Sequence, residues 1–386
     1  MSDDQNIPKI PNMEISKARF LLANGPNELK QQAKDLIMKH VKEDEMAPYY
    51  ELICKEFNFP IDNNLLSQLQ KTNEEKLKQF EEKLEDAQQN LGETEISDAL
   101  IAKAEYLAKI GYKEKALSAY RIAYEKTGPL GQRIDMLFLQ IRMGFFWNDN
   151  ELTNKNIEKA KGLIEEGGDW DRRNRLKVYQ GINFLINRDF KSATPLLLDT
   201  LATFSSTELM DYKDFVKYAV LSSMITLKRP DLKAKVINAP EILEVVNDIP
   251  YLEQYMNSLY NCEYANFFKA LANIEQQLKL DPVLFTHYKY YVREMRIISY
   301  AQLLESYRSV TIESMASSFG VSESLSMSID LSRFIGAGRL NCVIDKVDGI
   351  VQTNRPDSKN AQYQLAIKQG DILLNRVQKL SRVINS

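Results

Sequence analysis

The segment that most constrains the fold runs from Tyr307 to Asn354, near the C-terminus. Thr311 is a favourable N-cap for a short helix, and Gly320 can adopt the positive φ that a helix C-cap needs. Ser322 predicts the start of a second helix, and Gly336 to Gly338 predicts its end. This segment is therefore expected to hold two short helices joined by a tight turn.

A β-hairpin is expected directly after these helices. Apolar and more polar residues alternate from Leu340 to Asp345, which is the period of a strand. Asp348-Gly349 is a strong signal for a type I′ turn, in which both central residues have positive φ. Ile350 to Thr353 supplies the return strand. A helix-turn-helix followed by a hairpin is the pattern of a winged helix.

The charges of this winged helix argue against its common use, which is DNA binding. A DNA reader places Lys or Arg on its second helix to meet phosphates and base edges. Here that helix carries Glu323, Asp330 and Arg333, and the wing is nearly balanced in charge. We therefore interpret the module as protein-binding. DNA binding stays as an alternative, which steeply salt-dependent binding to a duplex would support.

A final helix is expected from Asp357 or Ser358 to the end of the chain. Its apolar positions recur at alternating spacings of three and four, which is a heptad seam. Such a helix must pack either on this chain or on helices of other subunits. A glycine in the seam weakens an isolated helix by about 1 kcal/mol relative to Ala. It also permits close helix approach, which favours a bundle. The seam consists of Tyr363, Ala366, Gly370, Leu373, Val377, Leu380 and Ile384.

The middle of the chain repeats the pattern of a tetratricopeptide-type helix pair. Small residues let two helices approach closely, and an aromatic residue fills the space between them. Further pairs are expected over Ile134–Glu166 and Tyr212–Pro240. Several units at a period of roughly 34 residues predict an α-solenoid. The clearest sets are Ala104, Leu107, Gly111, Ala116, Tyr120 and Ala123; Gly181, Leu185, Phe190, Ala193 and Leu197; and Tyr255, Leu259, Tyr264, Phe267 and Leu271.

The predicted fold class is mainly α, with a TPR-like α-solenoid followed by a winged helix and a long C-terminal helix. Before the repeats, Leu66 to Leu91 predicts a long charged helix that packs along a neighbour by one narrow stripe. The expected division is an N-terminal tail and helices (1–92), helical repeats (93–285), a winged-helix part (286–356) and a terminal helix (357–386).

Composition limits the classes of function. The chain has 386 residues and a formal net charge of -3, which does not indicate general affinity for nucleic acid or membranes. It lacks an apolar run of about 18 residues, so no membrane span is expected. Cys54, Cys262 and Cys342 lie far apart, which favours buried thiols in a reducing compartment over a disulfide framework.

No catalytic motif is found. The two histidines, His40 and His287, lie far apart in sequence, and no zinc-hydrolase, P-loop or nucleophile-elbow motif occurs. His40 lies on the apolar side of its helix and is interpreted as a packing residue. A basic cluster of Arg172, Arg173, Arg175 and Lys177 is either a contact patch for an acidic partner or, preferably, a capped helix start with a solvated face. No cofactor or metal is expected.

Several segments carry a family resemblance. They are Glu45–Tyr50, Gly167–Trp170, Val292–Arg296, Tyr300–Tyr307, Thr353–Asp357 and the closing run Lys368–Asn385. Together with the solenoid and winged helix, they resemble the PCI-domain proteins of the proteasome lid, the signalosome and a translation initiation factor complex. The resemblance is strongest to one non-ATPase PCI subunit of the lid, the one paralogous to the largest PCI subunit of the signalosome.

The resemblance implies a non-catalytic scaffold that supports ubiquitin-dependent protein degradation in the cytoplasm and nucleus. The implied partners are other PCI subunits of the lid, the lid deubiquitinase pair and the base, in a hetero-oligomer without nucleic acid or membrane. Winged helices of such complexes associate through wing strands, and C-terminal helices gather into a bundle. The alternatives are the equivalent signalosome subunit, a nucleic-acid-binding protein and an unrecognised enzyme. Candidate interface residues in the wing are Leu340, Cys342, Ile344, Ile350 and Val351.

Overall fold

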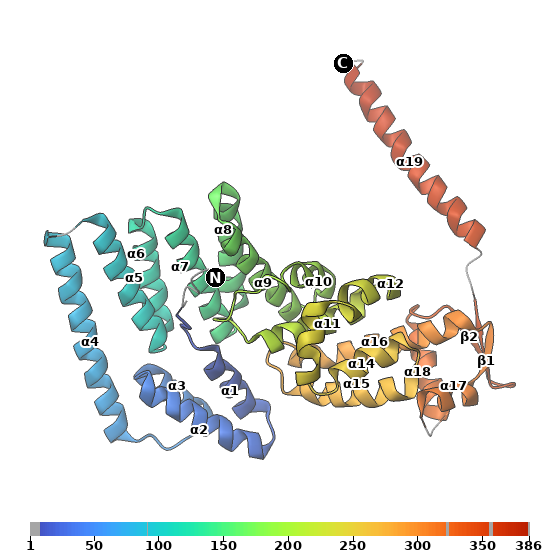
Figure 1. The fold of residues 1–386 in the computed structure, drawn as a ribbon, viewed down its shortest axis with the longest axis horizontal. Coiled ribbons are helices and arrows are strands. Elements are labelled where there is room, and N and C mark those ends of the chain that lie inside the picture. The colour runs from blue at the N-terminus through green and yellow to red at the C-terminus, as the bar shows by residue number, and fades with distance from the viewer. Residues whose placement is uncertain (1–7, 91, 322–323, 355–357, 385–386) are drawn as a thin grey trace. The chain divides into compact units, whose positions relative to one another are not determined.

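The computed structural model describes residues 8–90, 92–321, 324–354 and 358–384. It is mainly α-helical with one small sheet, as predicted (Figure 1). Residue contacts divide the chain into two compact units. The first comprises residues 1–256 and 272–291, and the second comprises residues 257–271 and 292–386.

The first unit begins with α1 (Met13–Asn24), α2 (Asn27–Glu43) and α3 (Ala47–Phe57) around one apolar core. The long helix α4 (Asn63–Asn90) follows and packs along α5 (Glu93–Lys109). Tyr106 of α5 donates a hydrogen bond of 2.9 Å to the Asn73 side chain, and its ring lies 5.3 Å from that of Phe80. The buried residues of α4, Leu69, Asn73 and Ala87, lie on one side of the helix, which confirms the prediction of a long helix that packs by one narrow stripe.

Antiparallel helix pairs follow, and neighbouring pairs lie side by side (Figure 1). Small residues explain the close packing within them. Gly111 makes the turn after α5 with φ of +89°, and Ala104 and Ala116 beside it are fully buried. A Cβ at Gly181 would come within 2.7 Å of a Leu197 methyl carbon. The pairs are α5 with α6 (Lys113–Lys126), α7 (Leu130–Trp147) with α8 (Asn150–Gly167), and α9 (Trp170–Ile186) with α10 (Phe190–Asp199).

The predicted later pairs also form helices. The region after Tyr212 contains α11 (Tyr212–Thr226), α12 (Arg229–Leu232), a π-helical turn (Lys233–Ile237) and α13 (Pro240–Val245). A 3₁₀ turn (Val246–Asp248) leads to α14 (Leu252–Tyr260) and α15 (Tyr264–Lys279), which contain the third matching set. A second 3₁₀ turn (Phe285–His287) precedes α16 (Tyr288–Ser306). The helical-repeat prediction is thus confirmed.

The winged helix is confirmed in the second unit. It comprises β1 (Ser309–Thr311), α17 (Ile312–Phe319), α18 (Ser324–Gly336), β2 (Cys342–Asp345) and β3 (Ile350–Thr353). The Thr311 side chain caps α17 by accepting from the Ser314 backbone, and Gly320 ends it with φ of 65°. The core beneath the sheet includes Met315, Phe319 and Val351.

Two details of the sheet differ from the sequence prediction. It has three antiparallel strands in the order β1-β3-β2, and β1 was missed because three residues are too few to show a period. The hairpin loop has four residues, since Asp345 pairs with Ile350. Within the loop Gly349 has positive φ, but Asp348 does not, so a type I′ turn is wrong. The Asp345 carboxylate instead holds the loop by accepting a 2.9 Å hydrogen bond from the Val347 backbone.

The second helix of the module, α18, buries one face in the core of the winged helix. Its buried face contains Met327, Leu331 and Phe334, whereas Ile329 is exposed. The predicted cap at Ser322 lies outside the described residues.

The last element is α19 (Ser358–Ile384), a single long helix. Of the two predicted caps, Asp357 lies outside the described residues, and the helix starts at Ser358. Side chains from 362 to 384 are all exposed.

Candidate protein-interaction surfaces

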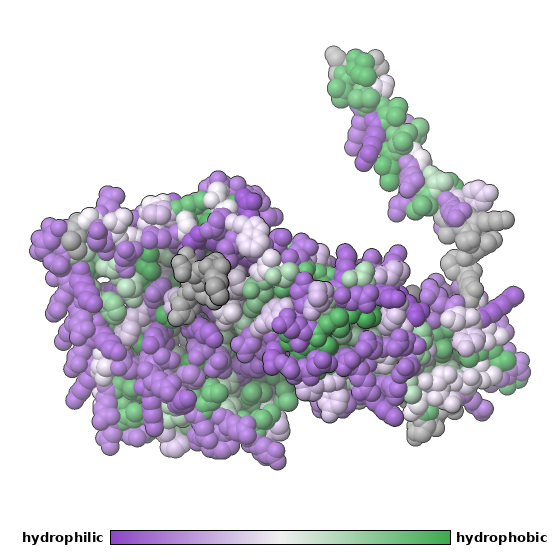
Figure 2. Space-filling view, in the orientation of Figure 1, coloured by the Kyte–Doolittle hydropathy of each residue, from purple (hydrophilic) through white to green (hydrophobic). Residues whose placement is uncertain are grey.

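The terminal helix presents its entire predicted seam to solvent. Tyr363, Leu373 and Leu380 expose 67%, 66% and 61% of their surfaces, and Ala366, Gly370, Val377 and Ile384 are exposed as well. Figure 2 shows apolar side chains along the length of α19. Full burial of one such aliphatic side chain stabilises a contact by roughly 1.5–3 kcal/mol. The seam is therefore a strong candidate for a protein interface.

A second apolar line on α19 was missed from the sequence. Leu365, Ile372 and Val383 are separated by seven and eleven residues, so they lie on one side of the helix, away from the seam. All three are exposed. Seven and eleven residues are both close to a whole number of helical turns, so the spacing in the sequence would have been enough to predict this second line. With apolar residues on two sides, α19 is suited to lie between neighbouring helices.

The wing divides the predicted interface residues into two groups. Leu340, Cys342 and Val351 are buried in the core of the winged helix, and burial raises the pKa of the Cys342 thiol. Ile344 and Ile350 are half-buried, so their side chains are partly available to a partner. β2 forms one edge of the sheet.

The exposed apolar side chains of the wing were not singled out from the sequence. Val347 is 94% exposed at the hairpin loop, Val343 points outward from β2, and Tyr307 is half exposed before β1. The outward orientation of Val343 could have been predicted from strand alternation, because its neighbours Cys342 and Ile344 face the core.

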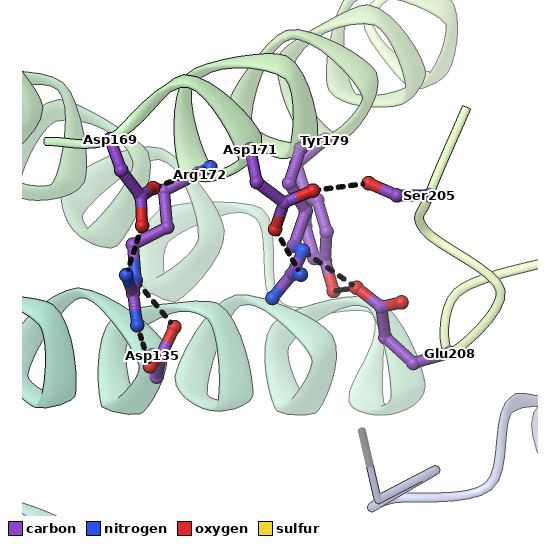
Figure 3. Close-up of polar contacts among 8 residues, drawn as sticks. Asp135, Asp169, Asp171, Arg172, Tyr179, Ser205 and Glu208 are labelled. Atoms are coloured by element: carbon purple, nitrogen blue, oxygen red, sulfur yellow. Dashed lines mark hydrogen bonds and ion pairs between the residues drawn. The ribbon is translucent and has the colours of Figure 1, made fainter. Parts of the chain in front are cut away.

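The basic cluster at the start of α9 is occupied by contacts within the chain. Asp169 caps the helix by accepting from the Arg172 backbone at 2.9 Å, which confirms the predicted capped start. The Arg172 guanidinium donates two hydrogen bonds to Asp135 of α7, at 3.0 and 2.6 Å, and a third to Asp169 (Figure 3). These carboxylates, Asp135 first, raise the pKa of Arg172.

The expectation of a solvated face is wrong for Arg175. This side chain is buried and lies 2.6 Å from the Asp171 carboxylate, which also accepts from Ser205 (Figure 3). Nearby, the hydroxyl of buried Tyr179 donates to Glu208 at 3.0 Å. Arg173 remains exposed, and Lys177 lies 3.5 Å from Asp199. Arg172 therefore joins α9 to α7 through Asp135, whereas Arg175 pairs within α9 with Asp171.

The two histidines take part in packing contacts. His287 Nε2 lies 2.8 Å from the Ile186 carbonyl oxygen, and His40 lies 3.6–3.9 Å from the carboxylates of Glu14, Glu43 and Asp44. Among the described side chains, no group of three or more His, Cys, Asp or Glu is arranged to hold a metal ion. Within the same ranges, no helix is both long and apolar enough to cross a membrane.

Comparison with known proteins accounts for this combination of elements. Three family models match: "26S proteasome subunit RPN7" over residues 62–235, "PCI domain" over 253–355, and "26S proteasome regulatory subunit RPN7/PSMD6 C-terminal helix" over 362–384. The 26S proteasome non-ATPase regulatory subunit 6 homolog of Arabidopsis thaliana is 48% identical, over 97% of both chains. The chain belongs to the RPN7/PSMD6 family of 26S proteasome regulatory subunits.

Other relatives agree with this family. The 26S proteasome non-ATPase regulatory subunit 6 of Dictyostelium discoideum is 45% identical over 99% of this chain and 100% of the relative. The COP9 signalosome complex subunit 1 of Arabidopsis thaliana is only 23% identical, over 62% of this chain and 53% of that protein. The predicted family is therefore confirmed, and the signalosome protein is a distant relative. The C-terminal family model covers the exposed part of α19, which includes both apolar lines.

Proposed function

We propose that this chain is a non-catalytic structural subunit of the lid of the proteasome regulatory particle. Membership of the RPN7/PSMD6 family and the PCI domain support a role in assembly with other subunits. The observation that carries the proposal is α19, whose apolar side chains are exposed on two sides. A helix of this kind is stabilised when other helices cover it, so it supplies a contact for a bundle of C-terminal helices.

The proposed partners are other PCI subunits, the deubiquitinase pair of the lid and the base. In the wing, the edge strand β2 and the outward side chains Val343 and Val347 favour contact with a neighbouring winged helix. Leu340, Cys342 and Val351 support that surface from within the core, while Ile344 and Ile350 reach it in part.

We assign a structural role to each of the four segments predicted from the sequence. Residues 1–92 and 93–285 form the arm, residues 286–356 contact neighbouring PCI subunits, and residues 357–386 enter the bundle. The proposed location is the cytoplasm and nucleus, where the assembled proteasome supports ubiquitin-dependent degradation.

A seam variant tests the bundle role. Leu373→Asp combined with Leu380→Asp places two charges on the seam, and Asn375→Asp places one on the polar side as the matched control. Because all three positions are exposed, the isolated chain should keep its helical content in each case. We expect the double variant to be lost from purified lid, and the control to be incorporated normally. Stoichiometric incorporation of the double variant would refute the bundle role.

Two other functions are separated by simple measurements. Mass spectrometry of co-purifying subunits distinguishes a lid from a signalosome, and proteasome subunits are the expected result. The sequence of α18 (Ser324–Gly336) carries a single basic residue, Arg333, so the second helix of the winged helix lacks strong basic character. Salt-dependent duplex binding by the isolated protein is therefore not expected.

A further inference from the structure

The second apolar line of α19 belongs to a longer stripe that also carries basic residues. Three cations lie among its apolar members at spacings of three and four residues, so all six side chains share one side of the helix. All of them are exposed. This side lies about a third of a turn away from the heptad seam, so a helix that packs on the seam does not cover it. The set, named here the basic stripe, consists of Leu365, Lys368, Ile372, Arg376, Lys379 and Val383.

The charges in this part of the chain are unbalanced. Residues 362–384 contain four basic side chains and a single acidic one, Asp371, although the whole chain has a net charge of -3. Asp371 itself lies about a third of a turn away from the basic stripe. Arg376 and Lys379 have no acidic residue three or four positions away, so α19 offers them no carboxylate along the helix.

The spacing of these cations is also unfavourable for an isolated helix. Arg376, Lys379 and Arg382 follow one another at intervals of three residues, at which like charges repel. The helix dipole favours basic side chains only in the last turn, which holds Arg382, so it does not offset the charges of Arg376 and Lys379. Carboxylates that approach from another molecule would remove this repulsion. The basic stripe is therefore complementary to an acidic surface that also carries apolar side chains.

We infer that the basic stripe binds an acidic amphipathic helix of another subunit, distinct from the helix that covers the seam. This inference rests on the proposed function, because it concerns the same bundle. The aliphatic side chains of that helix pack on the apolar members of the stripe, and its Asp or Glu side chains pair with Arg376 and Lys379.

Two other occupants fit the basic stripe less well. A second copy of this chain would place the same positive charges opposite one another, because the stripe contains no acidic residue. A helix that lies on a membrane surface presents one apolar face and one polar face. The apolar residues of α19 lie on two sides, which favours a position between other helices.

Carbodiimide coupling of the purified lid, followed by mass spectrometry of its peptides, tests the chemistry of the partner. This reagent joins a lysine amine to a carboxylate when the two groups are in contact. We expect Lys379 to be coupled to an Asp or Glu of another subunit. Coupling of Lys17 to Asp214, which lie 3.0 Å apart within this chain, is the internal control. If the control product forms and Lys379 gives none, the inference is wrong.

Variants measure what the two charges contribute. Arg376→Gln with Lys379→Gln removes two positive charges from the stripe, and Gln364→Glu with Gln378→Glu changes the net charge equally on the polar side. All four positions are exposed and all replacements are good helix formers, so both variants should fold. Each is co-expressed with the parental chain, and mass spectrometry gives their ratio in purified lid. We expect the stripe variant to be depleted about tenfold relative to the control, the size expected for two lost charge pairs.

The outcomes separate this inference from the proposed function. Equal incorporation of the two variants would overturn the inference alone, whereas absence of the parental chain from the lid would overturn both. Binding of the full chain to vesicles of phosphatidylserine and phosphatidylcholine, lost in the stripe variant, would assign the basic stripe to a membrane surface instead and overturn the inference.

Discussion

Replacement of Asp281 by alanine should be among the most destabilising single changes in the first unit. Its carboxylate is 3% exposed and accepts from Lys217 at 2.5 Å and from the Tyr218 hydroxyl at 2.8 Å. It also accepts from the backbones of Val283 and Leu284. These bonds join α11 to the segment that follows α15. The alanine variant leaves a largely buried ammonium group without its counter-ion and the buried Tyr218 hydroxyl without its acceptor.

The magnitude follows from the burial of the pair. Removal of one member of a buried ion pair typically costs about 3–5 kcal/mol, because the remaining charge stays desolvated. The pair of Lys213 with Asp248 is the matched control, since its lysine is also on α11 and its distance is 2.8 Å. Both of its side chains are more than half exposed, so Asp248→Ala should cost at most about 1 kcal/mol.

Urea denaturation followed by circular dichroism provides the measurement. The free energy of unfolding is obtained from the midpoint and the slope m, and both variants remove one negative charge. We expect the Asp281→Ala midpoint to fall well below that of Asp248→Ala, with m unchanged. Equal losses in the two variants would refute the argument that burial decides the strength of the pair.

Three further changes test other parts of the structure. Gly144→Ala should destabilise the protein by about 1–3 kcal/mol, because the new Cβ would lie 2.2 Å from the Thr153 hydroxyl oxygen. Gly162→Ala is the control: its Cβ meets no atom within 4 Å, so it should stabilise the protein by about 0.5–1 kcal/mol. Thermal unfolding of the two variants measures the difference. Gly370→Ala meets no atom of this chain, so it should leave the isolated protein folded yet reduce its incorporation into the lid; normal incorporation would disprove close helix approach there. Lys113 and the helix N-terminus lower the pKa of Asp149 below its ordinary value of 3.8. The stability gained from this charge is present above that value and is lost as the pH falls through the lowered one. Asp149→Asn should therefore destabilise by about 0.5–1 kcal/mol at pH 7 and by less at pH 3, and an equal loss at both values would contradict this.

Features that depend on neighbouring residues were predicted well from the sequence. Thr311 and Gly320 mark the ends of α17, because capping and positive φ are local properties. The helix-pair pattern and the terminal seam are likewise periodicities of a single helix or helix pair. By contrast, β1 is too short to carry a period, and the wing loop depends on a side-chain acceptor at Asp345.

The candidate surfaces were predicted only in part for a related reason. Strand alternation placed Leu340, Cys342 and Ile344 on one side of β2, but it did not say that this side faces the core. The core-facing side is set by α17, α18 and the sheet together. The second apolar line of α19 can also be read from the sequence, but it was missed because the heptad seam on the same helix contains more residues.

The sequence by itself determined the order of the modules, the helix ends and the seam, since each depends on residues within a few turns of one another. Only the tertiary structure decided which charges are satisfied. Arg175 with Asp171 could be guessed from helical spacing, but Arg172 with Asp135 and Lys217 with Asp281 join distant segments. Burial and the choice of partner are properties of the packed chain, because they depend on which segments exclude water from one another.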